Sequence, residues 1–139
     1  ASRNLDKFIQ FTKSAVDMIL EKTKTDGIVA YGLNIMAVID TDQEDSSKFL
    51  LEKFIKQEDG AVAFIGGGVR LIFETNGGDK CRNDLRLDPR FGPKSTPTKS
   101  IQVNQNSHLE TTSLPTLEHL NSRVTQIYNE LPTLLGKIL

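Results

Sequence analysis

The chain is poor in the residues that form disulfides and metal sites. Among its 139 residues, Cys81 is the one cysteine, and His108 and His119 are the two histidines. A single cysteine excludes an internal disulfide and a cysteine-rich zinc site. Because the sequence holds no cluster of ligating residues, we expect no metal and no cofactor. A thiol without a partner also suits a reducing compartment, so we expect a cytoplasmic, intracellular protein.

Long hydrophobic runs, tryptophan and a strong net charge are absent as well. The longest apolar stretch covers residues 27–39, which is too short to span a bilayer, so we expect no membrane span. The net charge of −1 argues against binding to nucleic acid or membrane by bulk charge. Phe91 is the one aromatic residue in the basic segment 80–99, so stacking surfaces for nucleic acid are scarce there. The composition, with 37% hydrophobic and 25% charged residues, is typical of a soluble globular protein.

Local catalytic and nucleotide-binding signatures are also missing. The glycines at 66–68 are the most suggestive stretch, but a phosphate-binding loop needs a lysine and a hydroxyl residue next, where Val69 and Arg70 stand. Glycine adopts positive φ at no steric cost, so we predict that the three glycines form a hairpin turn between strands at 61–65 and 69–74. The lack of a nucleophile motif favours a non-enzymatic protein. An enzyme with a non-local active site stays an alternative, because catalytic triads assemble from distant residues.

The acidic segment 40–45 predicts the start of a helix rather than a metal site. Its carboxylates have the spacing of a calcium loop, but the sixth loop position is not glycine and the twelfth, Leu51, is not glutamate. Thr41 followed three residues later by Glu44 matches a capping box, and carboxylates stabilise a helix N-terminus. We therefore predict a helix after this segment that ends at Gly60.

Two longer helices are predicted from apolar residues at helical spacing. In the first, over 4–24, the expected core positions are Leu5, Phe8, Ile9, Val16, Ile19 and Leu20. In the second, the spacings are 3, 4, 3 and 4, which is nearly a heptad seam, at Leu117, Leu120, Val124, Ile127 and Leu131. Pro132 should kink or break this helix and leave an apolar tail that needs cover.

The strand predictions are less uniform. Continuous apolarity over 28–39 fits a buried helix or one or two strands, and its Val, Ile and Tyr residues favour strands. The Asn-Gly pair after residue 75 indicates a turn. Three prolines and scattered charges predict a long irregular basic loop at 79–99. Residues 100–114 resemble a weak hairpin that turns at 104–107 and lies at a sheet edge.

Together these elements predict a single α+β domain over 1–139. Its sheet should be small and mostly antiparallel, with two N-terminal helices and one long C-terminal helix packed on one face. Because the sequence begins at Ala1 rather than Met, we expect a processed chain or a piece excised from a larger protein.

Two functions fit this fold. The first is a non-enzymatic interaction or oligomerisation module, regulatory or scaffolding, that binds a protein partner or a second copy as a homodimer through its C-terminal helix. The expected interface residues are Leu117, Leu120, Val124, Ile127, Leu131, Leu134, Leu135 and Ile138. The alternative is a sensory or ligand-binding domain that holds a small anion with guanidinium groups, which match carboxylate and phosphate. The expected anion-binding residues are Arg70, Arg82, Arg86 and Arg90.

Overall fold

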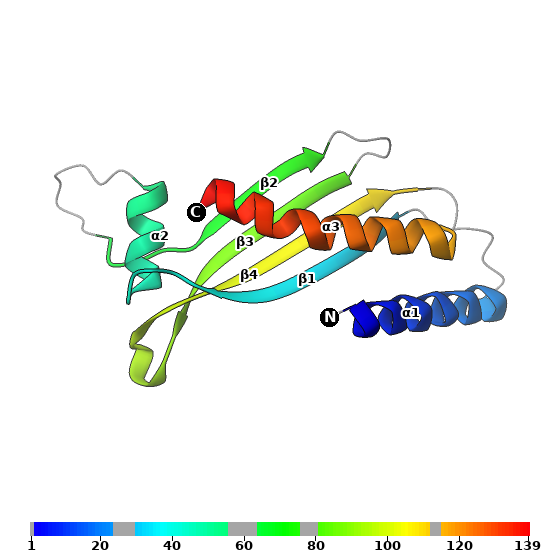
Figure 1. Ribbon diagram of the computed structural model, residues 1–139, viewed down its shortest axis with the longest axis horizontal. Coiled ribbons are helices and arrows are strands. Elements are labelled where there is room, and N and C mark those ends of the chain that lie inside the picture. Colours follow the sequence, from blue (N-terminus) through cyan, green and yellow to red (C-terminus); the bar gives the residue numbers. More distant parts are fainter. Residues whose placement is uncertain (1, 24–29, 56–63, 76–80, 112–114) are drawn as a thin grey trace. The chain divides into compact units, whose positions relative to one another are not determined.

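The structure is a computed structural model that describes residues 2–23, 30–55, 64–75, 81–111 and 115–139. It confirms the α+β class, with three helices and a four-stranded antiparallel sheet (Figure 1). The elements in chain order are α1 (Ser2–Thr23), β1 (Ala30–Asp40), α2 (Ser46–Phe54), β2 (Val69–Thr75), β3 (Cys81–Phe91), the 3₁₀ helix η1 (Pro93–Ser95), β4 (Pro97–Glu110) and α3 (Leu117–Ile138). The chain divides into two compact units, Ala1–Tyr31 with Glu110–Leu139, and Gly32–Leu109.

The sheet has the strand order β1-β4-β3-β2, which Figure 1 shows as cyan, yellow, light green and green arrows. Thr75 pairs with Cys81 across the β2–β3 hairpin, so the two strands flank the predicted Asn-Gly turn, whose own residues lie outside the described ranges. Successive strand residues point to opposite faces, and one face is buried. Its centre consists of side chains with no exposed surface, namely Leu85, Leu87, Ile101 and Val103. Burial of each such side chain contributes about 1.5–3 kcal/mol.

The helix α2 packs against β3 within the same unit. Its N-cap is Asp45, whose carboxylate accepts a hydrogen bond from the Lys48 amide at 3.0 Å. The predicted capping box is therefore wrong, because the Thr41 hydroxyl instead donates to the carbonyl of Gln43 at 2.8 Å. The helix ends at Phe54, before the predicted end at Gly60, which lies outside the described residues.

The other unit contains α1 and α3, which contact one another. The Thr116 side chain caps α3 by accepting a hydrogen bond from the His119 amide at 3.1 Å. Pro132 was predicted to kink or break the helix, and it does not break it, because α3 continues through it to Ile138. A proline removes one backbone hydrogen bond, and buried residues on both sides of it, Ile127 and Leu135, hold the helix together.

The prediction of an irregular loop at 79–99 is also wrong, because β3, η1 and the start of β4 occupy it. Its prolines stand where strands tolerate them. Pro89 lies at a register shift between β3 and β4, Pro93 begins η1, and Pro97 is the first residue of β4.

Two more strand predictions are resolved by the sheet order. Residues 97–110 form one continuous strand rather than a hairpin, and this strand lies between β1 and β3 rather than at an edge. Residues 30–40 form one continuous strand, which confirms the preference for strand over 28–39 in its described part.

The glycines at 66–68 do not form a hairpin turn. Residues 64–68 contain no strand, and none of the three glycines has a positive φ. A Cβ on Gly66 would lie 1.7 Å from the Ser47 hydroxyl oxygen, and one on Gly68 would lie 2.6 Å from a carboxylate oxygen of Asp88. Glycine is favoured at these two positions because the backbone passes close to α2 and β3, and a larger residue would displace the Ser47 or Asp88 side chain.

Candidate binding surface on the open face of the sheet

The face of the sheet opposite the buried one is open, and it carries most of the charged strand residues. Along β3, exposed residues alternate with buried ones from Cys81 to Asp88. All four predicted anion-binding arginines are exposed residues of β2 and β3 on this face: Arg70, Arg82, Arg86 and Arg90. The structure therefore places Arg82, Arg86 and Arg90 on a regular strand rather than on the loop predicted at 79–99, and Arg70 on β2, where a strand was predicted.

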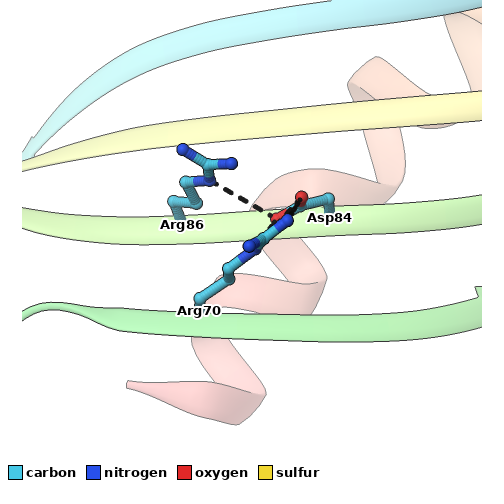
Figure 2. A network of polar contacts seen from close by, with 3 residues as sticks. All are labelled: Arg70, Asp84 and Arg86. Atoms are coloured by element: carbon cyan, nitrogen blue, oxygen red, sulfur yellow. Dashed lines mark hydrogen bonds and ion pairs between the residues drawn. The ribbon is translucent and has the colours of Figure 1, made fainter.

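The centre of this face is a carboxylate shared by two arginines, which Figure 2 shows. Arg70 reaches Asp84 through Nε, 3.0 Å from Oδ1 and 3.2 Å from Oδ2, and through NH2, 2.5 Å from Oδ2. Nε of Arg86 lies 3.6 Å from Oδ1 of the same carboxylate. Arg70 and Arg86 are direct cross-strand partners. Like charges in such positions repel, and Asp84 compensates this repulsion.

The same contacts keep Asp84 charged. The hydrogen bond from Arg70 lowers the pKa of Asp84 below its ordinary value, and Arg86 contributes in the same direction. In turn, the hydrogen bond to Asp84 raises the pKa of Arg70. Since exposed ion pairs contribute little to stability, the main consequence is geometric: Asp84 fixes where the two guanidinium groups lie.

Arg86 is the arginine best placed to contact another molecule. Its side chain is 51% exposed, and its ion pair with Asp84 uses Nε. Figure 2 shows its terminal nitrogens directed away from Asp84. Its cross-strand partner on β4 is Asn104, and Asn106 and Gln102 lie opposite Asp84 and Asp88. A guanidinium beside amide side chains offers several donors to an incoming carboxylate.

The open face also carries apolar side chains, which the sequence analysis did not single out. Met36 and Val38 of β1 are 68% and 53% exposed, and Ile72 of β2 is 52% exposed. They share this face with the arginines, because the exposed positions of each strand alternate with its more buried ones. The signal that would have revealed this face is the period-two alternation of β3 and β4, which three prolines obscured.

The eight predicted interface residues of α3 are mostly not at the surface. Four are buried, namely Val124, Ile127, Leu131 and Leu135. Three are half-buried, namely Leu120, Leu134 and Ile138. Leu117 is 42% exposed. As the helix is folded, the buried members of this stripe are not accessible to a second molecule.

The calcium-like segment serves structural roles. Asp40 accepts a hydrogen bond from the Ser100 hydroxyl at 2.7 Å and lies 3.3 Å from the Lys99 ammonium. These two contacts, the serine bond first, lower the pKa of Asp40. Asp45 caps α2.

The described residues include no group of three or more His, Cys, Asp or Glu side chains that could hold a metal ion. Among the helices in the described ranges, none is long and apolar enough to cross a membrane. Comparison with protein-family models, with curated proteins and with solved structures finds no match.

Proposed function

We propose that the chain is a non-enzymatic protein-interaction module whose open sheet face binds an acidic segment of a partner protein. The observation that carries this proposal is Arg86. It is exposed, Asp84 orients it together with Arg70, and its terminal nitrogens are directed away from that carboxylate. A carboxylate side chain of a partner can bind these nitrogens in the bidentate geometry that guanidinium favours.

The spacing of the arginines supports an extended partner. Arg82, Arg86 and Arg90 recur every four residues along β3. At 3.4 Å per residue, neighbouring arginines are about 13 Å apart along the strand. One small anion therefore contacts one of them, whereas a polypeptide that runs along the strand reaches all three.

The composition of the face supports a protein rather than a nucleic acid. Asp84 and Asp88 alternate with the arginines along β3, and this arrangement repels a continuous phosphate backbone. Proteins that bind single strands stack bases on aromatic side chains. The face offers Met36, Val38 and Ile72 as its large exposed hydrophobic residues among the described strand positions, and these suit apolar side chains of a protein.

The test is a selection of peptides from a random library on the immobilised full chain and on two variants. Arg86→Glu reverses the charge at the proposed anchor. Lys53→Glu makes the same reversal at an exposed position of α2 and serves as the matched control. We expect the wild type and the control to enrich peptides in which Asp or Glu stands next to apolar residues. Arg86→Glu should lose these peptides.

Two outcomes would contradict the proposal. One is a set of wild-type peptides with no acidic preference, and the other is equal binding of the selected peptides to Arg86→Glu. The donors of Arg86 and Asn104 also suit a small anion, so thermal unfolding with phosphate and with citrate separates the two functions. A rise in Tm that Arg86→Ala abolishes, with no enriched peptide, would favour a ligand-binding domain.

A further inference from the structure

The helix α1 has a large apolar surface that the described residues of its own unit leave exposed. Phe8, Phe11, Met18 and Ile19 are 52%, 75%, 54% and 59% exposed. Phe8 and Ile19 were predicted to lie in the core, so that prediction is wrong for both. The buried side of α1 includes Ile9, which is 4% exposed and lies about 100° around the helix from Phe8.

The exposed apolar residues, together with the half-buried Ala15, form a regular stripe. Phe8, Phe11, Ala15 and Met18 are separated by 3, 4 and 3 residues, which is the spacing of the a and d positions of a heptad. Ile19 flanks the stripe. The stripe also continues beyond α1, since Phe8 and the half-exposed Tyr128 of α3 line one groove. A seam of this kind requires a partner helix.

We propose that this stripe pairs with the same stripe of a second copy of the chain, with the two α1 helices antiparallel. This inference does not depend on the proposed function of the sheet. In the antiparallel arrangement, Phe8 of one copy faces Met18 of the other, and Phe11 faces Ala15. Each layer then joins a large side chain to a smaller or more flexible one, which avoids the overfilling that two facing Phe11 rings would cause.

The flanking charges select the same arrangement. Lys7 and Glu21 are exposed and lie one residue before Phe8 and three residues after Met18. In the antiparallel pair, Lys7 of each copy therefore lies beside Glu21 of the other, and the symmetric dimer contains two such pairs. A parallel pair would place Lys7 beside Thr12 instead, with no opposite charge.

The apolar area is close to what a specific dimer needs. At about 200 Å² for a fully exposed large side chain, the exposed parts of Phe8, Phe11, Met18 and Ile19 amount to roughly 450 Å² per copy. Two copies bury roughly 900 Å², and the flanking side chains bring the total to about the 1,000 Å² of a specific interface. Interfaces at this lower end of the size range are typical of weak complexes, so we expect a dimer in the micromolar range.

The charge balance favours a second copy over a lipid surface. The sequence of α1 contains Arg3, Lys7, Lys13 and Lys22, against Asp6, Asp17 and Glu21. Helices that lie in a membrane interface are rich in Lys and Arg on their polar face. The near balance of α1, with Lys13 paired to Asp17, suits pairing between proteins.

The test is sedimentation equilibrium of the full chain up to about 100 μM, well above the micromolar range expected for the dimer. The wild type should be dimeric at this concentration, and Phe11→Asp should be monomeric. The control is Gln10→Asp, which introduces the same charge at the residue before Phe11, on the polar side of α1. This variant should remain dimeric. Circular dichroism of each variant establishes that the fold is retained.

The antiparallel orientation of the two α1 helices is tested separately, with charge-reversal variants. Lys7→Glu or Glu21→Lys alone should weaken the dimer about tenfold, because each replaces two attractive pairs by repulsive ones. The double variant, Lys7→Glu with Glu21→Lys, should restore the wild-type Kd. A double variant as weak as the single ones would overturn the antiparallel register. A wild type that stays monomeric, or that binds phosphatidylcholine–phosphatidylserine vesicles as a monomer, would overturn the dimer.

Discussion

The buried side of the sheet contains a polar cluster, and the removal of one of its members should destabilise the protein strongly. Asn83 is 1% exposed and joins β3 to β4. Its Oδ1 accepts hydrogen bonds from the Ser107 hydroxyl at 2.7 Å and from Gln105 Nε2 at 3.3 Å, and the Cys81 thiol lies 3.9 Å away. Its Nδ2 donates to the carbonyl of Cys81 at 3.3 Å.

The cost of Asn83→Ala follows from the groups that it leaves behind. Gln105 and Ser107 are 5% and 0% exposed, so water does not replace the lost acceptor. The Ser107 hydroxyl loses this acceptor, whereas Gln105 Nε2 keeps its hydrogen bond to Ser107 Oγ at 3.3 Å. A buried donor left unsatisfied costs about 1–3 kcal/mol, and the cavity adds to this. We expect a loss of about 4 kcal/mol from the free energy of unfolding, which is a large part of the 5–15 kcal/mol typical of a domain.

Urea unfolding followed by circular dichroism measures this loss, because the midpoint shifts in proportion when the slope is unchanged. The control is Asn106→Ala, an exposed amide on the open face, which should change the stability by less than about 0.5 kcal/mol. The triple variant Asn83→Leu, Gln105→Leu, Ser107→Ala removes donors and acceptors together. It should be far more stable than Asn83→Ala. A loss below about 1 kcal/mol for Asn83→Ala would refute the reasoning.

Three further predictions concern single positions. Gly66→Ala should lower the free energy of unfolding by about 1–3 kcal/mol, because its Cβ would overlap a buried hydroxyl of α2. Gly67→Ala is its matched control, with no atom within 4 Å of the added Cβ, and equal urea midpoints for the two variants would contradict the close-approach explanation. Pro132→Ala should raise the stability by about 1–3 kcal/mol, because it restores a helical hydrogen bond, and an unchanged Tm would refute this. Asp84→Asn should flatten the acid side of the stability–pH curve. The pKa of Asp84 is lowered in the folded chain, so its contribution is present above the unfolded value near 3.8 and is lost as the pH falls through the lower folded value. Urea unfolding at several pH values measures this contribution to the free energy of unfolding. Identical stability–pH curves for the variant and the wild type would contradict the role of Arg70.

The helices could be predicted from the sequence because their period is visible whatever surrounds them. The apolar spacing placed both ends of α1 and the start of α3 within a few residues, although α3 continues beyond Pro132. The strands β3 and β4 could not be predicted in this way. Asn83 and Gln105 are buried although they are polar, so the alternation of apolar with polar residues is interrupted where the cluster lies. The sequence of a single strand does not reveal the register shift at Pro89. It also does not reveal the pairing between strands that gives these amides their hydrogen bonds.

The arginines of the candidate site could be predicted from the sequence, but their arrangement could not, because it depends on pairing between strands. The four arginines could be named from the sequence because guanidinium chemistry does not depend on context. Their arrangement depends on the register that sets Arg70 opposite Arg86 and brings Asp84 within reach of both. No spacing along the chain encodes that register, since the two strands meet only after the hairpin closes.

Two departures from the ordinary distribution of polar and apolar residues have opposite consequences. The polar cluster around Asn83 is buried, and Asn83 and Ser107 bond to one another within the sheet, whereas Gln105 Oε1 is the one buried side-chain atom of these three residues with no hydrogen-bond partner in the structure. The apolar stripe of α1 is exposed, and no described residue provides the burial that would stabilise Phe8, Phe11 and Met18. A large apolar surface that stays exposed after folding indicates a binding partner. Buried polar groups that bond to one another indicate only how the core is specified. On this physical distinction, association is expected at α1, where the apolar residues remain exposed, rather than at the heptad of α3, where folding has already buried them.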